Sequence, residues 1–304
     1  MEITTYRDLQ SKDELLPLFQ HAFWWSFNPS EFDETIHADP RLRSSPVGFA
    51  ALSCNRVVGF VGVMDIETRT LQRSVEAVGG VWGVVTSPTH ARKGVFKALM
   101  MRSHDYFEEQ GYKFSLLYTS KILIAHAFYK RLGYRDVAAH SSAYKLMGGT
   151  TKPPQRIEKK EKVDWSRIQR IYNQATENCT GFVVRDREYG KMLETRKRIQ
   201  PEKTIVTDKG YVLLKASEGV TFVQELIALT KKDVGNLVTR VEERTEKAVI
   251  DQKVQDKNAM DTYQSRGYII LKKGYDLLMS KQLTTATFRE TYGPQFYATS
   301  ADFF

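Results

Sequence analysis

Runs of apolar residues predict three strands in the first third of the chain. These runs occupy residues 47–54, 56–66 and 75–85. They are rich in valine and are separated by polar or turn residues, a pattern that favours strands. Residues 11–25 repeat their apolar positions at the period of a helix. A second helix is predicted from Arg92 to Gln110, because Gly111 follows it where glycine commonly ends a helix.

The pattern continues through residue 147 with a strand at 113–119, a helix at 123–132 and two further strands. Gly133 follows this helix as a C-terminal glycine cap does. Strands that alternate with helices in this order predict a mixed α/β (α+β) fold with one central sheet.

A domain boundary is predicted at "GGTTKPPQ", residues 148–155, which is dense in glycine and proline. A second passage of similar plan follows, with helices expected at 163–177, 186–199 and 231–244 and with strands such as "YVLLKA" and "KAVIDQ". We expect four segments along the chain: a first domain at 1–148, a linker at 149–162, a second domain at 163–280 and a C-terminal tail at 281–304.

Short motifs repeat between the two halves. The stretch "FYKRLGYR" at 128–135 parallels "TYQSRGYI" at 262–269. Three pairs of residues share one common offset: Tyr129 and Tyr263, Gly133 and Gly267, Tyr134 and Tyr268. Because the order of predicted elements around both motifs is also the same, we infer a tandem duplication.

The net charge of the 304-residue chain is +9, but the excess is spread thinly. Its densest run, at 152–162, mixes both signs with two prolines, which is typical of a solvated linker and not of a groove that follows phosphates. We therefore expect no nucleic-acid partner.

The sequence has no secretory leader and no apolar run long enough to cross a bilayer, so it predicts a cytoplasmic protein that does not enter the membrane.

Cysteine and histidine usage gives no indication of a metal. Cys54 and Cys179 stand one in each half, outside any C-x-x-C motif, and are expected to be buried free thiols. The six histidines show no paired-ligand spacing. We predict that no metal is bound.

The stretch "THARKGVFKALM", residues 89–100, is the first candidate for chemistry. It follows a valine-rich strand and leads into a helix, whose first amide groups are unpaired and carry partial positive charge. Gly94 would let a ligand approach the backbone closely, and Arg92, Lys93 and Lys97 add positive charge. A pyrophosphate would suit such a site. The alternative is an ordinary strand-to-helix turn in which the basic residues are incidental.

Several features of the first half occur together in one order. They are "VVT" at 84–86, Pro88, "RKGV" at 92–95 and "FYKRLGY" at 128–134. This layout resembles the GNAT superfamily of acyl-CoA-dependent N-acetyltransferases, so we expect two tandem GNAT folds. The usual Q/R-x-x-G-x-G/A motif is met only in part, since Ala91 and Phe96 take its first and last places. The stretch from Pro88 is more similar to the Eis-like (enhanced intracellular survival) branch, whose pattern is PTHRRRGLLRALM.

The resemblance implies that the first half is catalytic and binds acetyl-CoA as co-substrate. The residues that it assigns to CoA are Val84, Val85 and Thr86 for the pantetheine arm, Arg92, Lys93, Gly94, Val95, Phe96 and Lys97 for the pyrophosphate, and Thr119 and Ser120 as a further contact. Lys121 departs from the family, which tends to have glutamate there.

Two catalytic residues follow from the same resemblance. Tyr129 matches the tyrosine that acts as general acid toward the departing thiolate. The C-terminal carboxylate of Phe304 matches the group that takes the proton of the substrate amine. Tyr129 could instead be a packing tyrosine on an amphipathic helix, as Tyr263 is expected to be, and the tail could simply dock on the surface.

The chain departs from the Eis-like pattern after the second half. Only about two dozen residues follow residue 280, whereas relatives usually carry a third, sterol-carrier-like domain. In the second half "KKDVGNLV" places Asp233 where the first half has basic residues, and a carboxylate repels a pyrophosphate. We expect a degenerate second GNAT domain that completes the acceptor cleft or forms an interface in a homo-oligomer.

The predicted reaction is transfer of acetyl from acetyl-CoA to an amine by direct attack on the thioester. The resemblance implies a small-molecule acceptor of polyamine or aminoglycoside type, or a lysine amine. The candidate acceptor residues are Trp24, Trp25, Phe27 and Glu31, which could equally be core aromatics and a solvated turn. Three other functions stay open: a non-catalytic acyl-CoA sensor, a Fem-type transferase and a mycothiol-synthase-like tandem GNAT enzyme.

Overall fold

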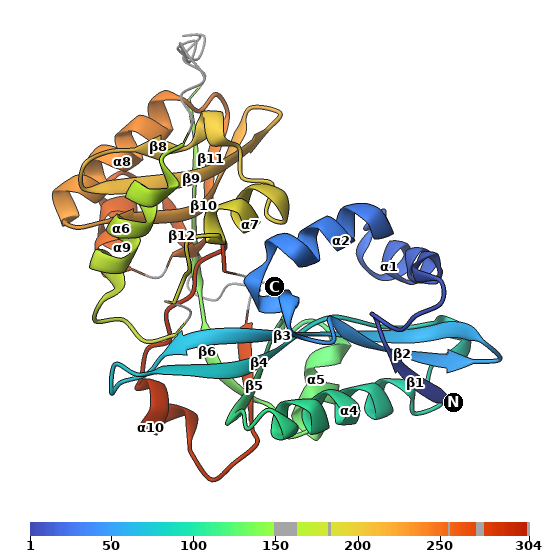
Figure 1. Ribbon diagram of the computed structural model, residues 1–304. Coiled ribbons are helices and arrows are strands. Elements are labelled where there is room, and N and C mark those ends of the chain that lie inside the picture. The colour runs from blue at the N-terminus through green and yellow to red at the C-terminus, as the bar shows by residue number, and fades with distance from the viewer. Residues whose placement is uncertain (149–162, 182–183, 255, 272–276, 303–304) are drawn as a thin grey trace.

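The computed structural model describes residues 1–148, 163–181, 184–254, 256–271 and 277–302. Two mixed β-sheets form the molecule, and helices cover both faces of each sheet (Figure 1). The predicted linker 149–162 lies outside the described residues, and the predicted domain boundaries stay predictions. The expected mixed sheet flanked by helices in each half is confirmed.

The elements of the first half follow the expected order, with short helices added before the first long strands. They are β1 (Glu2–Thr5), α1 (Leu15–Phe23), α2 (Pro29–Ala38), α3 (Pro40–Arg43), β2 (Gly48–Ser53), β3 (Arg56–Arg69), β4 (Val75–Thr86), α4 (Val95–Glu109), β5 (Phe114–Thr119), α5 (Ile124–Arg131), β6 (Arg135–Ala139) and β7 (Ser141–Leu146). The apolar periodicity that predicted these elements is the pattern of their buried side chains.

The second half repeats this plan. Its elements are α6 (Trp165–Thr176), α7 (Tyr189–Thr195), β8 (Ile205–Val206), β9 (Gly210–Ser217), β10 (Val220–Ala228), α8 (Lys231–Glu243), β11 (Ala248–Val254), α9 (Lys257–Ser265), β12 (Ile269–Leu271), β13 (Leu277–Gln282) and α10 (Phe288–Tyr292). Three short 3₁₀ turns lie at Lys12–Glu14, Pro88–His90 and Pro201–Lys203.

The two halves exchange one strand each. The first sheet has the order β1-β2-β3-β4-β5-β13-β6, so β13 from the second half lies between two strands of the first. The second sheet has the order β12-β7-β11-β10-β9-β8, so β7 from the first half lies between two strands of the second. Neither sheet is complete without the other half of the chain.

Each sheet is packed on both faces. In the first half α1 and α2 lie on one face and α4 and α5 on the other (Figure 1). In the second half α8 and α9 cover one face and α6 and α7 the other. Phe19, Phe60 and Phe114 are fully buried on the first face, and Leu99 and Phe107 on the second, so the faces are apolar layers that hold the sheet in place.

The C-terminal segment joins the two cores. Phe296 packs into the first half, on the face of α1, whereas the next residue, Tyr297, packs into the second half beside α6. Gly181 pairs with Arg69 at the end of β3 and with Tyr297, so one residue connects the first sheet to the tail. The close approach of the Tyr297 backbone to Gly181 leaves no room for a side chain there.

A buried network of charges fixes the end of this segment. Arg185 donates two hydrogen bonds to Glu225, at 2.8 and 2.6 Å, and one to Asp302 at 2.7 Å. The Asp302 carboxylate also accepts from Tyr189 at 2.8 Å and from Thr299 at 3.0 Å. The Arg185 guanidinium holds the pKa of Asp302 below its usual range, although burial alone would raise it.

Replacing the Asp302 carboxylate with an amide is expected to destabilise the protein by about 3 kcal/mol, because the charge-assisted hydrogen bond from Arg185 is lost and an amide cannot accept from all the buried donors around it. The measurement is urea unfolding of Asp302→Asn. Since the folded-state pKa is lowered, the stabilisation is present above the unfolded pKa of about 3.9 and is lost as the pH falls through the lowered value.

Glu188→Gln is the matched control, because its partner Arg43 also joins the two halves but lies in an exposed pair. That substitution is expected to cost less than about 1 kcal/mol. Equal effects of the two substitutions would show that the buried network does not stabilise the fold.

One expectation about the cysteines is wrong. Cys54 is exposed, because Cys54 and Asn55 form the tight turn between β2 and β3, with φ angles of 49° and 58°. Cys179 is half-buried.

No helix in the described part of the chain is long and apolar enough to span a membrane.

Candidate CoA-binding and catalytic site

The two central strands of the first sheet part from each other midway. β4 and β5 run parallel and pair from Gly79 and Ser115 up to Val81 and Leu117. Beyond that point β4 stays paired only with β3, and β5 only with β13. A bulge at Gly83, whose φ is 57°, bends β4 where the strands separate. The strands thus leave an opening in which β4 has no ladder partner on the side of β5.

The helix after β4 begins three residues later than the sequence predicts. It starts at Val95, because Arg92 and Gly94 have φ angles of 62° and 81° and form a turn. Glycine adopts this conformation without cost, and an added side chain atom at Gly94 would meet nothing within 4 Å. The predicted helix start at Arg92 was wrong because a positive φ at an arginine is not visible in the apolar pattern.

This turn leaves a set of amide groups without partners. Among the described residues no acceptor is recorded for the amides of Arg92, Gly94, Val95, Phe96 and Lys97, whereas Ala98 donates to the Gly94 carbonyl and begins the helical ladder. The side chains of Arg92, Lys93 and Lys97 are exposed and make no ion pair within the described ranges. Free amides and positive side chains at a helix N-terminus are suited to bind phosphate oxygens.

The other predicted CoA residues lie along the same opening. Val84 and Thr86 are half-buried on β4 beyond its last pair with β5, and Val85 is buried against the core. Thr119 ends β5 and Ser120 follows it, both half-buried. The structure therefore brings the predicted strand residues and the α4 turn to one end of the first sheet.

Tyr129 lies on α5 against the first turn of α4. Its ring centroid is 5.8 Å from that of Phe96 and 5.9 Å from that of Tyr134. The side chain is 6% exposed, and burial raises the pKa of its phenol above the ordinary value. The structure records no partner for the Tyr129 hydroxyl among the residues that it describes.

The repeat partner of Tyr129 is used differently. The Tyr263 hydroxyl donates to the buried Asp251 carboxylate at 3.0 Å. Both helices end at a glycine with positive φ, Gly133 at 94° and Gly267 at 77°, so the backbone motif is the same in the two halves. The two tyrosines therefore differ in the hydrogen bonds of their hydroxyls: that of Tyr263 is bound to Asp251, and none is recorded for that of Tyr129 among the described residues.

The candidate acceptor residues are not all in one place. Phe27 is buried in the core and Trp25 packs on Phe19, whereas Trp24 ends α1 with its side chain 85% exposed. Glu31 is exposed on α2, 3.7 Å from Arg198 of the second half. Phe304 lies outside the described residues, and its catalytic role stays a prediction.

A set of buried charges beside the opening was not predicted. Asp39 accepts from Arg41 at 2.9 Å and from Arg196 of the second half, and the Arg196 guanidinium lies 5.7 Å from the ring centroid of Trp82. Trp82 is the residue at which β4 and β5 part. Periodicity gives no signal for such a set, because Asp39 and Arg196 are far apart in sequence and each is typical of a surface position.

Two strands of the second half part in the same way, but the opening between them is occupied by the chain itself. β10 and β11 pair in parallel only up to Val223 and Asp251, and then part. The tail enters this opening, since the Ala301 amide donates to the Gln224 carbonyl at 3.2 Å and Thr299 donates to Glu225 at 2.6 Å. The cavity left beside them is only about 20 Å³, roughly one water molecule.

The first turn of the helix after β10 differs from that of α4. Thr230 caps α8 by accepting from the Asp233 amide at 3.3 Å, and its hydroxyl donates to the Asp233 carboxylate at 2.5 Å. The chain thus supplies a cap to α8 and places a carboxylate beside Lys231 and Lys232, whereas the first turn of α4 has no side-chain cap and no acidic residue. No group of three acidic, histidine or cysteine residues in the described ranges could hold a metal ion.

Comparisons with known proteins agree with this geometry. Residues 5–137 match the sequence family described as Acetyltransferase (GNAT) domain. A search of curated proteins by sequence gave no match.

Several solved structures share the fold over nearly the whole chain. A GCN5-related N-acetyltransferase from Kribbella flavida is 16% identical with a TM-score of 0.67, covering 93% of this chain and 72% of that chain. One from Anabaena variabilis is 14% identical with a TM-score of 0.65, covering 93% and 73%. Eis1 from Mycobacterium abscessus is 17% identical with a TM-score of 0.60, covering 93% and 74%. Residues 5–137 are thus similar in sequence to a GNAT acetyltransferase domain, and the chain shares its fold with N-acetyltransferases of known structure.

Proposed function

We propose that the protein is an acetyl-CoA-dependent N-acetyltransferase of the Eis-like branch, with one working site in its first half. The observation that carries this proposal is the α4 turn, where free amides and basic side chains stand at the end of the opening between β4 and β5. The GNAT match of residues 5–137 supports acetyl-CoA as the co-substrate.

The proposed residue roles follow the opening. The free amides of Arg92 and of residues 94–97 bind the pyrophosphate, together with the side chains of Arg92, Lys93 and Lys97. The free side of β4, from Val84 to Thr86, binds the pantetheine arm through backbone groups, and Thr119 and Ser120 contact it from β5. No rearrangement of the strands is needed for this binding, because β4 and β5 are already apart.

The reaction forms one bond and breaks one. The acceptor nitrogen attacks the thioester carbonyl carbon, the new C–N bond forms, and the C–S bond breaks to release the CoA thiolate. The surplus proton on nitrogen passes to a base, for which the Phe304 carboxylate stays the predicted group. Tyr129 donates a hydrogen bond or a proton to the departing sulfur.

The environment of Tyr129 favours donation of a hydrogen bond to the departing sulfur over transfer of a proton to it. Burial raises the pKa of its phenol, so the side chain stays protonated at neutral pH. A thiolate with a pKa of about 8.5 is a much weaker base than this phenolate would be, so complete proton transfer is uphill. A hydrogen bond from the phenol still stabilises the charge that develops on sulfur.

We propose a structural role for the second half. Its opening is occupied by the tail, and its α8 turn is capped by Thr230 and places the Asp233 carboxylate where a pyrophosphate would lie, which supports a half that binds no CoA. It contributes Arg196 to the charges beside Trp82 and so helps to shape the acceptor side of the first opening.

Acetyl transfer is tested by release of free thiol from acetyl-CoA in the presence of a panel of amines. The panel contains an aminoglycoside, a polyamine, a lysine peptide and a primary alkylamine. We expect turnover with at least one amine and none with the corresponding alcohols, because the mechanism needs a nitrogen nucleophile. Tight CoA binding without turnover on any amine would instead favour the non-catalytic sensor.

A further inference from the structure

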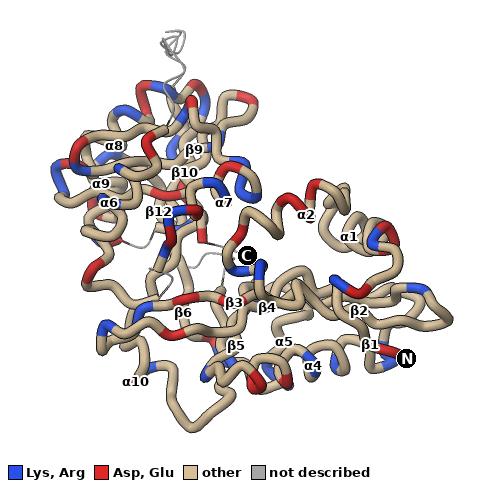
Figure 2. Tube along the Cα trace, viewed as in Figure 1, with Lys and Arg blue, Asp and Glu red and all other residues tan. Residues whose placement is uncertain are grey.

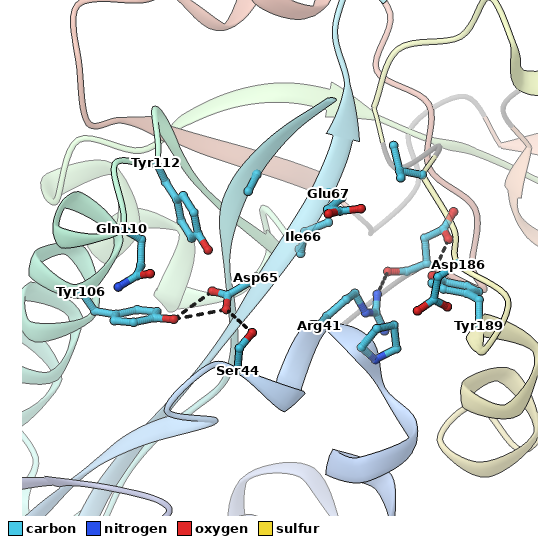
Figure 3. A pocket seen from close by; sticks show the side chains of 14 residues that line it. Arg41, Ser44, Asp65, Ile66, Glu67, Tyr106, Gln110, Tyr112, Asp186 and Tyr189 are labelled. Carbon is cyan, nitrogen blue, oxygen red and sulfur yellow. Dashed lines mark hydrogen bonds between the residues drawn. The ribbon is translucent and has the colours of Figure 1, made fainter. Parts of the chain in front are cut away.

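A second cavity lies away from the CoA opening, at the junction of the two halves. It has a volume of about 440 Å³ and is lined by β3, the end of α4, α3 and the segment before α7 (Figure 3). This size is within the range of sites for small organic ligands. Ala77 lines it, five residues before Trp82 on the same strand, which places the cavity roughly 17 Å along β4 from the opening.

The cavity lies on a part of β3 that has no neighbouring strand on one edge. β2 pairs with β3 only as far as Gly62, and the next partner on that edge is Gly181, opposite Arg69. No ladder partner is recorded for the stretch between them within the described residues. Asp65 and Glu67 lie in this gap, two positions apart, so both side chains are on the same face of the strand.

The charge of the cavity is negative in a protein whose net charge is +9. Four acidic residues line it. Asp302 is paired with Arg185, whereas Asp65, Glu67 and Asp186 form no ion pair within the part of the chain that the structure describes. The only cation in the lining is Arg41, and its guanidinium is bound to the Asp39 carboxylate and to the Asp302 carbonyl at 3.0 Å. Charges of both signs cover the rest of the molecule (Figure 2).

Tyrosine side chains complete the walls. The Tyr106 hydroxyl donates to the Asp65 carboxylate at 3.1 Å, and Tyr112 stands beside it (Figure 3). Tyr189 forms the opposite wall near Asp186. Burial raises the pKa of Asp65 despite these donors, so the carboxylate lacks the positive partner that would lower its pKa. Aromatic rings next to carboxylates are suited to bind an alkylammonium ion.

The carboxylates of this cavity do not form a metal-binding cluster. No three acidic, histidine or cysteine residues in the described ranges are close enough to hold a metal ion. The acidic groups instead come from both halves of the chain, with Asp65 and Glu67 on β3 and Asp186 before α7. We propose that this cavity binds a linear alkyl diamine, with one ammonium group at Asp65 and the other between Glu67 and Asp186.

The test is calorimetric titration of the full chain with 1,4-diaminobutane at low salt, without acetyl-CoA. We expect binding that weakens at least fivefold in Asp65→Asn and in Glu67→Gln, since each loses one ion pair. 1-Aminobutane, with one charge, is expected to bind at least fivefold more weakly than the diamine. Because no CoA is present, the result does not depend on the proposed acetyl transfer.

Three controls test whether the diamine binds at this cavity. Asp105→Asn removes an exposed carboxylate from α4 outside the cavity and is expected to leave diamine binding unchanged. Glu218→Gln removes an exposed carboxylate between β9 and β10 of the second half and is also expected to have no effect. Thermal unfolding of each variant without ligand checks its folding. Equal loss in Asp105→Asn or Glu218→Gln, or binding kept in Asp65→Asn, would overturn the proposal.

Discussion

Replacing Gly94 with aspartate is expected to weaken CoA binding about a thousandfold. The new carboxylate would stand at the α4 turn, beside the free amides that we assign to the pyrophosphate. Two like charges about 4 Å apart near a protein surface repel by about 4 kcal/mol, and each 1.4 kcal/mol changes an affinity tenfold. The measurement is calorimetric titration with CoA, in which the wild-type protein should bind one CoA per chain.

The chain offers a matched control for this substitution at the other end of the same helix. Gly111 has a φ of 74°, close to the 81° of Gly94, and an added side chain atom meets nothing within 4 Å at either position. Gly111→Asp therefore introduces the same charge and similar backbone strain without facing CoA. Gly94→Asn adds a side chain of nearly the same size as aspartate but without its charge, so it separates the effect of charge on CoA affinity from the effect of size. If Gly94→Asp and Gly111→Asp bind CoA equally well, the pyrophosphate does not lie at the α4 turn.

Replacing Tyr129 with phenylalanine is expected to lower kcat by about 10² to 10⁴, the usual range for a lost acid or hydrogen-bond donor. CoA affinity should stay within about twofold, because the ring that packs on Phe96 and Tyr134 is kept. The measurement is thiol release under saturating acetyl-CoA, with the best amine found in the panel. Single-turnover kinetics would show whether the loss is in the chemical step.

Tyr263→Phe is the matched control for this experiment. It removes the equivalent hydroxyl of the second half, which donates to the buried Asp251 carboxylate. We expect lower stability and an unchanged kcat, since that tyrosine holds a structural hydrogen bond. A Tyr129→Phe enzyme with wild-type kcat would exclude Tyr129 as the donor to the leaving thiolate.

Much of the fold was predictable because local periodicity is strong in these segments. Strands such as β3 and β10 carry runs of apolar residues, and α5 ends just before Gly133 as its sequence indicates. The start of α4 was not predictable, because it depends on a positive φ at Arg92 that a turn imposes on an ordinary residue. The pattern of apolar residues shows which face of a helix or strand is buried. It does not show the backbone angles of the turn that precedes the helix or strand.

The strand exchange could not be predicted for a related reason. β7 and β13 are both strands, yet nothing in "SSAYKL" or "LLMSKQ" states which sheet each joins. The choice is made by long-range pairing, such as Leu278 opposite Tyr118 and Ala248 opposite Leu146. The candidate CoA residues were predicted from short motifs that resemble a known family, whereas the charges beside Trp82 come from both halves and left no local signal.

The exchanged strands also set the order of events during synthesis. β6 is synthesised with the rest of the first half. β13, which lies between β5 and β6 in the first sheet, is complete only when the ribosome has passed Gln282. At roughly 5 to 20 residues per second, more than a hundred residues separate the two events by roughly 5 s or more. During that time the first half carries an unpaired edge on β5, and it completes its sheet only when β13 has emerged.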